Sequence, residues 1–318
     1  MELKLKSNKQ VQNAYLAAGL YALCIGFSFI FVKLALVSAH PIDILAHRFN
    51  VSFVAASIPV LMGWVRINIK PKAILPILPL ALLYPVLFFT FQTFGLFYIS
   101  SSEAGIIQAT VPVFTMIAAS YFLKEHSSRS QKLFVLFAVA GVIYMVLMKG
   151  VRFESANVPG TVLMFLTSIS LAGYTVLTRK KAQLGNVLEI TYLMTAFGFI
   201  IFNSLSVIRH LSAGTLNLYF EPFTSPSFVV SILYLGICSS LASSLLSNYA
   251  LSQIEATKIS VFNHIATLIT IAGGYIFLQE ALEYYHLIGA VMIIAGVAGT
   301  NSRFSRANRR QADVKING

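Results

Sequence analysis

Two long stretches of this chain contain no charged side chain, and they constrain its fold more than any other feature. They cover residues 73–102 and 222–254. Each is longer than the roughly 20 apolar residues that a helix needs to cross a hydrocarbon layer of about 30 Å. Backbone groups that face lipid find no water to bond with, so such segments are expected to be helical. The chain is therefore predicted to be an all-α membrane protein.

The composition supports this prediction and excludes several classes of protein. Of the residues, 57% are hydrophobic and 11% are charged, and the mean hydropathy is +0.77. A typical soluble domain is about a quarter charged. So few charges cannot cover the surface of a soluble chain of 318 residues. Cys24 and Cys238 lie inside apolar runs and make no disulfide framework. A soluble enzyme, a secreted disulfide scaffold and a disordered protein are excluded.

Short polar connections separate ten apolar segments, which we predict to be membrane spans. The first span follows a basic stretch, is too long for a signal-peptide core and has no cleavage site after it, so we interpret it as retained. The longest connection, 210–226, carries several apolar side chains, and either lies along the outer interface or is an ordinary loop. The predicted spans are 14–37, 42–65, 73–99, 103–123, 132–149, 158–179, 187–209, 227–252, 256–279 and 284–301.

The Lys and Arg residues indicate the orientation of these spans. If the spans alternate in direction, 18 of the 23 basic residues lie on the side of both termini, and 3 lie on the other side. The remaining two, Lys33 and Arg48, fall within spans. Basic residues accumulate on the cytoplasmic side of membrane proteins, so both termini are predicted to be cytoplasmic. The net charge of +12 is thus an orientation signal and not a nucleic-acid patch.

The chain also contains an internal repeat. A shift of 155 residues aligns 99–142 with 254–297 without a gap and pairs FLKE at 122–125 with FLQE at 277–280. The loop 124–132 that follows the first FL has three Lys or Arg, whereas its counterpart has none. Five spans per copy invert the second copy, and this change of charge fits the inversion. Inverted repeats are typical of secondary transporters, whose site lies near the midplane between the copies.

These patterns predict how the chain is divided. Residues 1–13 form a cytoplasmic segment, and residues 302–318 form a basic cytoplasmic tail. Two inverted five-helix repeats, 14–149 and 158–301, make up the ten transmembrane helices, and an external connector, 150–157, joins them.

Four motifs resemble those of the drug/metabolite transporter superfamily, specifically its EamA-type members. They are 25–33 (IGFSFIFVK), 47–49 (HRF), the PVF and LKE elements within 112–125, and the Gly289 to AGV segment at 289–297. The sequence departs from the family at Ile25, where Trp is frequent, and at Thr267, where Pro is expected. Over about residues 14–301, the resemblance implies two EamA-type repeats and a ten-helix basket with a central cavity and alternating access. It also implies a cargo of amino acids, other metabolites or drugs, often moved outward.

Lys33 and Arg48 are candidate substrate contacts. A charge within a span costs about 2.5–3.5 kcal/mol at the centre on insertion scales. Lys33 either meets an anion in the cavity or extends to the interface from a helix end. Arg48 either holds a substrate carboxylate through two parallel bonds or makes a structural pair, for which Asp43 is a partly aligned partner.

Histidines are the candidate groups for proton coupling. His264 is predicted near the midplane of its span, and His47 precedes Arg48. Every carboxylate associated with a span sits near its end, whereas imidazole titrates near neutral pH. A histidine satisfied by polar neighbours is the alternative interpretation for both.

Amides and prolines complete the candidate site. Gln108 aligns with Asn263 in the repeat; these amides, with Gln92, either bind polar groups of the substrate or join helices. Asn248 lies on a polar face with Ser240, Ser244, Ser247 and Ser252, which faces a cavity or a neighbouring helix. Pro85 and Pro112 are predicted hinges because proline removes ladder hydrogen bonds. The glycines 141, 289, 296 and 299 are predicted to serve close helix packing.

The sequence therefore favours a secondary transporter of the plasma membrane, in a bacterial cell, that exports a small metabolite such as an amino acid or a similar amphipathic compound. The alternative is a polytopic membrane enzyme or accessory protein acting on lipid-linked substrates, which would need paired carboxylates or metal-ligand spacing that we do not find. We expect no catalytic residues, cofactor, metal or nucleic acid. A small-molecule substrate and the lipid bilayer are the expected partners, and proton coupling and a homodimer are compatible with the sequence.

Overall fold

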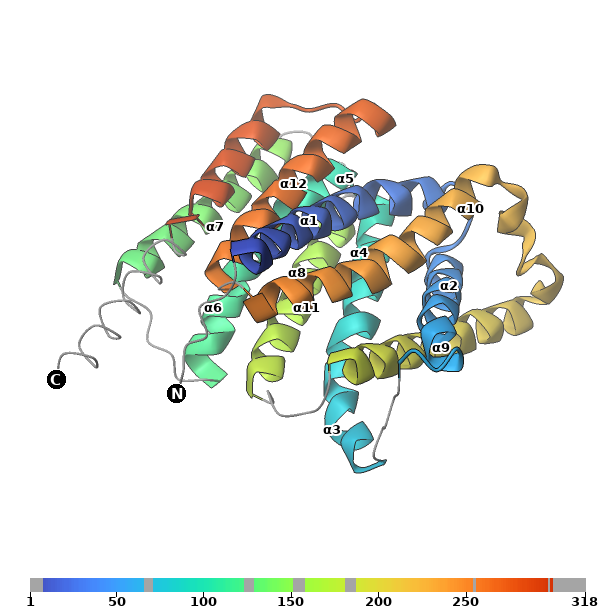
Figure 1. Cartoon of the computed structure of the whole chain (residues 1–318). Coiled ribbons are helices and arrows are strands. Elements are labelled where there is room, and N and C mark those ends of the chain that lie inside the picture. The colour runs from blue at the N-terminus through green and yellow to red at the C-terminus, as the bar shows by residue number, and fades with distance from the viewer. Residues whose placement is uncertain are drawn as a thin grey trace, which may run out of the picture.

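The computed structural model describes residues 8–65, 71–122, 129–150, 158–180, 187–253, 256–296 and 298–299. Within these ranges the regular structure is entirely helical, as the sequence predicts (Figure 1). The elements are α1 (Asn8–Leu36), α2 (Pro41–Leu61), α3 (Pro71–Ala81), η1 (Leu82–Leu87), α4 (Phe88–Tyr98), α5 (Ser101–Gln108), α6 (Val111–Phe122), α7 (Arg129–Gly150), α8 (Val158–Lys180), α9 (Val187–Ala213), η3 (Leu216–Leu218), η4 (Glu221–Thr224), α10 (Pro226–Leu233), η5 (Tyr234–Ala242), α11 (Ser243–Gln253), α12 (Ala256–Leu278) and a last helix, Tyr284–Gly296.

Seven helical stretches of the described chain are long and apolar enough to cross a membrane. The shorter apolar helices Lys132–Met145, Ile265–Leu278 and Tyr284–Gly296 fall within the three other predicted spans. The all-helical fold is confirmed, whereas the number of ten spans, the inverted repeats and the cytoplasmic termini stay predictions. The seven stretches are Gln12–Leu36, Pro41–Leu61, Leu75–Tyr98, Ser101–Phe122, Val158–Thr178, Leu188–Ala213 and Pro226–Ser247.

Two of the predicted spans are broken at their prolines. Tyr84, inside η1, has an extended backbone with φ −143° and ψ 118°. Pro85 follows it, and the residue before a proline is sterically pushed out of the helical region. In the next span, α5 ends before α6 begins, and Pro112 stands in the first turn of α6, where its missing N–H loses no helical bond. The breaks lie at the predicted hinges, and hinge motion itself stays a prediction.

A third span changes its helical pitch in the middle. Between α10 and α11, the element η5 is a π-helical stretch. The Oγ of Ser240 donates a hydrogen bond of 2.9 Å to the carbonyl of Leu235, five residues earlier. Such wide turns are rare and occur often at functional sites.

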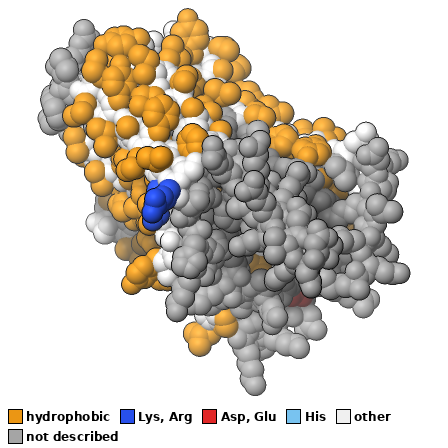
Figure 2. Space-filling model, turned by 90° about the vertical axis from the view of Figure 1, so that its left-hand side faces the viewer, with side chains coloured by type: hydrophobic (Ala, Val, Ile, Leu, Met, Phe, Trp, Pro, Cys, Tyr) orange, Lys and Arg blue, Asp and Glu red, His pale blue; other side chains and the backbone are white. Residues whose placement is uncertain are grey.

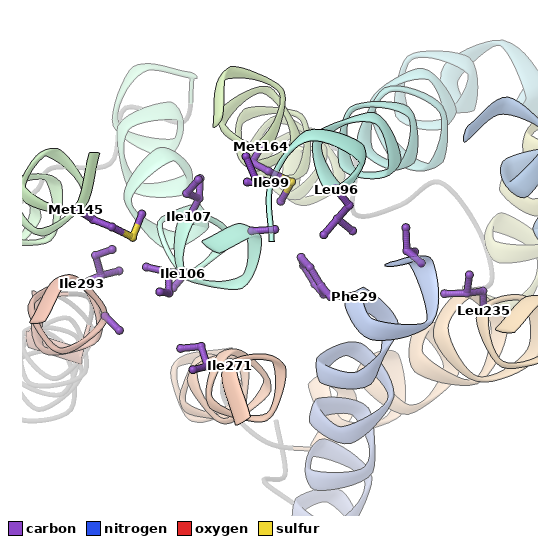
Figure 3. Close-up of a cluster of buried hydrophobic side chains, with 14 of the residues drawn as sticks. Phe29, Leu96, Ile99, Ile106, Ile107, Met145, Met164, Leu235, Ile271 and Ile293 are labelled. Atoms are coloured by element: carbon purple, nitrogen blue, oxygen red, sulfur yellow. The ribbon is translucent and has the colours of Figure 1, made fainter. Parts of the chain in front are cut away.

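The main helix contacts join the first half of the sequence to the second. Helix α1 packs against α12 and also against α10, η5 and α11 (Figure 1). Helix α2 packs against α9, and α8 packs against α4 and α6. A cluster of buried apolar side chains fills the space between these helices, with Phe29, Leu96, Ile106, Met164 and Ile271 among its members (Figure 3).

Large apolar side chains cover much of the outer surface. Leu61 is 85% exposed, Tyr121 is 80% exposed and Leu75 is 77% exposed. Figure 2 shows hydrophobic side chains over most of the described part of one face. Soluble monomers rarely expose apolar patches of more than a few hundred Å². This surface is therefore suited to contact lipid.

Glycines allow α7 and the last helix to approach closely. A Cβ added at Gly141 would stand 2.7 Å from the Cβ of Met292 and 3.1 Å from the carbonyl oxygen of Gly289. A Cβ at Gly296 would stand 2.7 Å from a backbone nitrogen of α7. A real Cβ does not fit at 2.7 Å, so the predicted role of Gly141 and Gly296 in helix packing is confirmed.

Candidate functional site

A cavity of about 170 Å³ lies inside the bundle, beside the breaks at η1 and η5. For comparison, an apolar cavity of about 150 Å³ accommodates a benzene-sized molecule. Within the described chain, the side chains that line this cavity include no Asp, Glu, Lys, Arg or His. Its aromatic lining residues are Tyr21, Phe49, Tyr84, Phe88, Phe89 and Tyr174, and its hydroxyl lining residues are Ser28, Thr191, Thr195, Ser239, Ser240, Ser243, Ser244 and Ser247.

The two predicted amides meet at this cavity. Gln92 of α4 and Gln108 of α5 both line it, and the Nε2 of Gln92 donates to the Oε1 of Gln108 at 3.4 Å. Pro85 lines the cavity as well. A second cavity of about 70 Å³ shares Gln108 with the first and includes Pro112. The breaks in the helices thus lie at the cavity walls.

The polar face predicted on the eighth span also faces the cavity. Ser240, Ser244 and Ser247 line it, which confirms the cavity-facing interpretation for these three residues. Their neighbours Ser239 and Ser243 add two further hydroxyls, because residues three or four positions apart share a helix face.

Arg48 lies directly behind the cavity wall and is 1% exposed. Its Nε donates to the Oγ of Ser240 at 2.8 Å, and its Nη2 donates to the Oγ of Ser239 at 3.0 Å. Its guanidinium carbon lies 3.9 Å from the centre of the Phe89 ring, a cation–π contact. The Nη1 atom finds no hydrogen-bond acceptor among the described residues. All three contacting residues line the cavity.

The local partner considered for Arg48 is wrong. Asp43 pairs instead with Arg209 of α9, whose Nη1 donates to the Oδ2 of Asp43 at 2.8 Å. The hydroxyl of Ser206 donates to the other carboxylate oxygen, and the Nε2 of His210 lies 3.3 Å from it. The reason is geometric: residues three or four apart share a helix face, and residues five apart do not.

Lys33 lies half-buried in the last turn of α1 and does not line either cavity. The carboxylates of Glu280 and Glu103 act on it electrostatically. Glu280 accepts hydrogen bonds of 2.6 and 2.9 Å from backbone N–H groups at the start of α5. The Nε2 of His286 lies 3.2 Å from the Oε1 of Glu103. Lys33 therefore stands beside an acidic cluster, and its predicted substrate contact stays a prediction.

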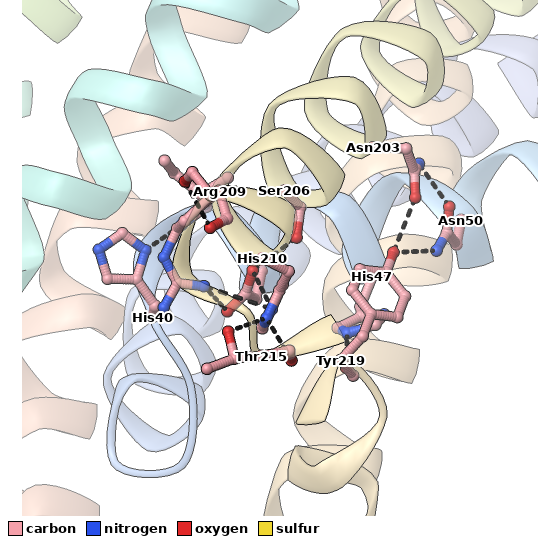
Figure 4. A network of polar contacts seen from close by, with 12 residues as sticks. His40, His47, Asn50, Asn203, Ser206, Arg209, His210, Thr215 and Tyr219 are labelled. Atoms are coloured by element: carbon pink, nitrogen blue, oxygen red, sulfur yellow. Dashed lines mark hydrogen bonds and ion pairs between the residues drawn. The ribbon is translucent and has the colours of Figure 1, made fainter. Parts of the chain in front are cut away.

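The connection between α9 and α10 folds onto α2. The buried His47 has its Nε2 3.0 Å from the carbonyl oxygen of Tyr219 (Figure 4). The ring centre of Phe223 lies 4.8 Å from the centre of the imidazole. Tyr219 is 9% exposed and packs inward, whereas Phe220 is 68% exposed, so the position of this connection along the outer interface stays a prediction. His47 lines neither cavity, and its predicted coupling role stays a prediction.

A polar network holds this connection in place (Figure 4). The hydroxyl of Tyr219 donates to the Oδ1 of Asn203 at 2.8 Å, and the Nδ2 of Asn203 donates to the Oδ1 of Asn50 at 2.6 Å. The Nδ1 of His210 lies 2.9 Å from the carbonyl oxygen of Thr215. These residues are not among the site residues predicted from the sequence. The polar stripe 203, 206 and 210 on α9 has helical spacing and is the signal that indicates them.

His40 and Tyr219 lie outside the spans, near the α9–α10 connection, and both have shifted pKa values. Burial lowers the pKa of His40 below its usual 6.5, the positive charge of Arg209 lowers it further, and the charge of Asp43 opposes the shift. Burial raises the pKa of the Tyr219 hydroxyl above its usual 10.0, against a hydrogen bond with Asn50. Both groups are therefore uncharged near neutral pH.

Three predicted site residues have side chains outside the described part of the structure: Asn248, Asn263 and His264. Their predicted roles stay predictions. Among the described residues, no group of three or more His, Cys, Asp or Glu side chains is placed to hold a metal ion.

Comparison with known proteins gives consistent matches over nearly the whole chain. The EamA-like transporter family matches residues 12–147 and 158–302. The uncharacterized transporter YcxC of Bacillus subtilis is 52% identical over 297 residues, which are 93% of this chain and 95% of that protein. An uncharacterized transporter of Archaeoglobus fulgidus is 30% identical over 87% of this chain and 93% of its own length. A solved crystal structure has a TM-score of 0.61 over 93% of this chain and 99% of that chain; at 18% identity, it shows the fold alone.

Proposed function

This chain belongs to the EamA-like transporter family and is a multi-pass transporter of the plasma membrane, and we propose that it moves a small metabolite outward by alternating access through the cavity. The proposed cargo is an amino acid or a similar amphipathic compound. The observation that carries this proposal is the lining of the cavity, which combines aromatic rings, hydroxyls and two amides.

The lining comes from both halves of the chain. Tyr84, Gln92 and Gln108 belong to the first predicted repeat, and Tyr174 and Ser240 belong to the second. A site shared between repeats is what alternating access requires, because it can be exposed to either side by moving one repeat against the other. The size of the cavity suits a small metabolite and not a lipid-linked substrate.

Breaks in the helices supply places for such a movement. The extended residue Tyr84 and its neighbour Pro85 separate α3 from α4 beside the cavity, and Pro112 stands after the break that separates α5 from α6. Interrupted helices concentrate a change of backbone angles in a few residues, so rigid segments can rock about them. We assign the hinge role to Pro85 and Pro112 on this basis.

The two amides are proposed to bind polar groups of the substrate. Their mutual hydrogen bond of 3.4 Å is long, so a ligand that bonds to both can replace it at small cost. Substitution of Gln92 or Gln108 by Ala is expected to reduce transport by about tenfold, the effect of losing one good hydrogen bond. Gln12→Ala removes an exposed amide on α1 and is the matched control.

Transport is tested with the full chain in proteoliposomes. Counterflow is measured for a panel of amino acids and other small metabolites, with empty liposomes as the background. Saturable uptake of at least one compound, reduced in the two cavity variants and normal in Gln12→Ala, is the expected result. Uptake at background for the whole panel, or equal uptake by all three variants, would count against the proposal.

Proton coupling through His47 and His264 is a separate part of the proposal. If imidazoles carry the coupled proton, an imposed pH gradient changes the initial rate of transport. A rate that is the same with and without the gradient removes proton coupling and leaves the transport proposal intact.

A further inference from the structure

Arg48 is a buried cation to which the described residues offer no anion. Its side chain is 1% exposed, and the ion pairs found in the described chain do not include it. Its contacts are the hydroxyls of Ser239 and Ser240 and the ring of Phe89, all of them neutral. Its Nη1 has no acceptor in this part of the protein.

Such an arrangement is unfavourable unless an anion joins it. A guanidinium remains protonated in proteins, so it cannot escape burial by losing its proton. An uncompensated buried charge is strongly destabilising, and neutral hydroxyls and an aromatic face offset part of this cost. A ligand with a negative charge would supply the missing partner and an acceptor for Nη1.

The guanidinium of Arg48 lies next to the cavity, so an anion bound there can be its missing partner. Ser239, Ser240 and Phe89, which contact the guanidinium, are also cavity-lining residues. An anion that binds against the two serines is therefore a neighbour of the guanidinium. Lys33, the other cation considered from the sequence, also lines neither cavity, but it differs from Arg48 because the carboxylates of Glu280 and Glu103 act on its charge.

We infer that the cavity binds a small monoanion, a carboxylate joined to an aromatic or branched aliphatic body, and that Arg48 selects its charge. This inference rests on the proposed transport function and narrows its cargo: among the amphipathic compounds proposed above, it favours one that carries a carboxylate and no ammonium group over a zwitterionic amino acid. The carboxylate binds against Ser239 and Ser240, next to the guanidinium behind them, while the body packs against Tyr84 and Phe88. Arginine suits a carboxylate because its planar N–H groups make parallel bonds to the two oxygens.

The same lining disfavours other charges. No carboxylate of the described chain lines the cavity, so an ammonium group finds no ionic partner there. One guanidinium balances one negative charge, so a dianion keeps an uncompensated charge. The cavity should therefore prefer a monocarboxylate to an amine, to a zwitterion and to a dianion of similar size.

Binding by the purified full chain tests this preference directly. The probes share one body: 3-phenylpropionate, its neutral amide, 3-phenylpropylamine and phenylalanine, with 4-methylpentanoate and its amide as a branched pair. Bound ligand raises the unfolding temperature, because it stabilises the folded state by RT ln(1 + L/Kd), where L is the ligand concentration. We expect a carboxylate to bind at least about tenfold more tightly than its amide, the amine or the zwitterion. Equal binding of amide or amine, or no binding by any carboxylate, would overturn the inference.

Variants show whether Arg48 causes the preference. In Arg48→Gln, the ratio of carboxylate to amide affinity should fall by about tenfold or more, and Arg48→Lys should keep part of it. Lys132→Gln removes an exposed cation on α7 and should leave the ratio unchanged.

If Arg48→Gln does not fold, Ser239→Ala and Ser240→Ala replace it. Each of these variants removes one hydrogen-bond acceptor of the Arg48 guanidinium. Each should therefore weaken binding of the carboxylate more than binding of the amide. An unchanged ratio in the folded variants would overturn the role of Arg48.

The outcome separates this inference from transport itself. If proteoliposomes carry an amine or an amide and reject the carboxylates, the transport proposal stands and the anion inference fails. If carboxylates bind with the expected preference but are not carried, the inference stands and the transport proposal fails.

Discussion

Arg209 of α9 donates a hydrogen bond of 2.8 Å to the carboxylate of Asp43, the third residue of α2, and so joins two helices that are far apart in the sequence. The Asp43 side chain is 7% exposed and the Arg209 side chain is 35% exposed. The hydroxyl of Ser206 and the imidazole of His210 complete the surroundings of the carboxylate.

Arg209→Gln should destabilise the protein, because it leaves a buried carboxylate with weaker partners. Hydrogen bonds to charged groups contribute about 1.5–3 kcal/mol, and the partial exposure of Arg209 reduces this, so we expect a loss of about 1–2 kcal/mol. Thermal unfolding in detergent measures it. Arg129→Gln, at an exposed site on α7, should have little effect. If Asp43→Asn and Arg209→Gln prove fully additive in the double variant, the pair contributes nothing of its own.

Glu280→Gln should also destabilise the protein. The Glu280 carboxylate accepts backbone N–H bonds from Ser101 and Ser102 and a hydroxyl bond of 2.7 Å from Ser102. It therefore caps the start of α5 from a distant part of the chain, where a negative charge also interacts favourably with the helix dipole. We expect a loss of about 1–3 kcal/mol. The matched control is Glu283→Gln, which removes a carboxylate from an exposed residue; equal loss in both variants would contradict the capping role.

Patterns within single helices predicted much of this structure. The uncharged runs predicted helices, Pro85 and Pro112 predicted where two of them are interrupted, and the spacing of the serines predicted the polar face of η5 and α11. Each of these features depends on neighbours within a few residues. Local spacing is sufficient to predict such features because helix geometry relates positions three and four apart.

Contacts between distant segments were not predictable in this way. Arg48 bonds to serines more than 190 positions later, and Asp43 finds Arg209 across 166 positions. A single sequence contains no information on which helix faces another, so the nearest candidate in sequence, Asp43 for Arg48, was the wrong partner. Tyr219 likewise suits a membrane interface and a protein core equally, and its packing against His47 buries it, whereas the neighbouring Phe220 is exposed.

Gly141→Ala should weaken the packing of α7 against the last helix. The added Cβ would stand 2.7 Å from the Cβ of Met292, so the helices must separate. Overpacking of this kind costs about 1–3 kcal/mol. At Gly19 of α1, the nearest contact of an added Cβ is an ordinary 3.9 Å, so Gly19→Ala should stabilise the protein by about 0.5–1 kcal/mol through helix propensity. Thermal unfolding compares the two, and equal effects would contradict the close approach.

His40 should make stability depend on pH. Its Nδ1 accepts a hydrogen bond of 3.3 Å from the backbone N–H of Ile42 and so caps α2, and burial lowers its pKa below 6.5. A lowered pKa in the folded state means that folding favours the neutral ring. The contribution is therefore complete above pH 6.5 and is lost as the pH falls through the folded pKa. His40→Asn keeps a capping acceptor that does not titrate. Unfolding temperatures between pH 7.5 and 5 should fall less in this variant; an identical pH profile would contradict the assignment.

The contact of Phe223 with His47 offers a test of alternating access. Their ring centres are 4.8 Å apart, and together they join the α9–α10 connection to α2. We propose that the α9–α10 connection is one of the gates of alternating access, so that this end separates from α2 during the cycle. A variant with His47→Cys and Phe223→Cys, made after Cys24→Ser and Cys238→Ser, can be bridged by a short thiol-reactive linker; because His47 is also a proposed coupling residue, transport by the same variant before bridging, with no pH gradient, is the reference rate. Bridging should lower the transport rate by about tenfold or more, and chemical reduction that releases the linker should restore the rate, while ligand binding to the cavity persists.

The two single-cysteine variants, treated identically, control for modification of each site. Normal transport by the bridged protein would show that this end stays closed throughout the cycle.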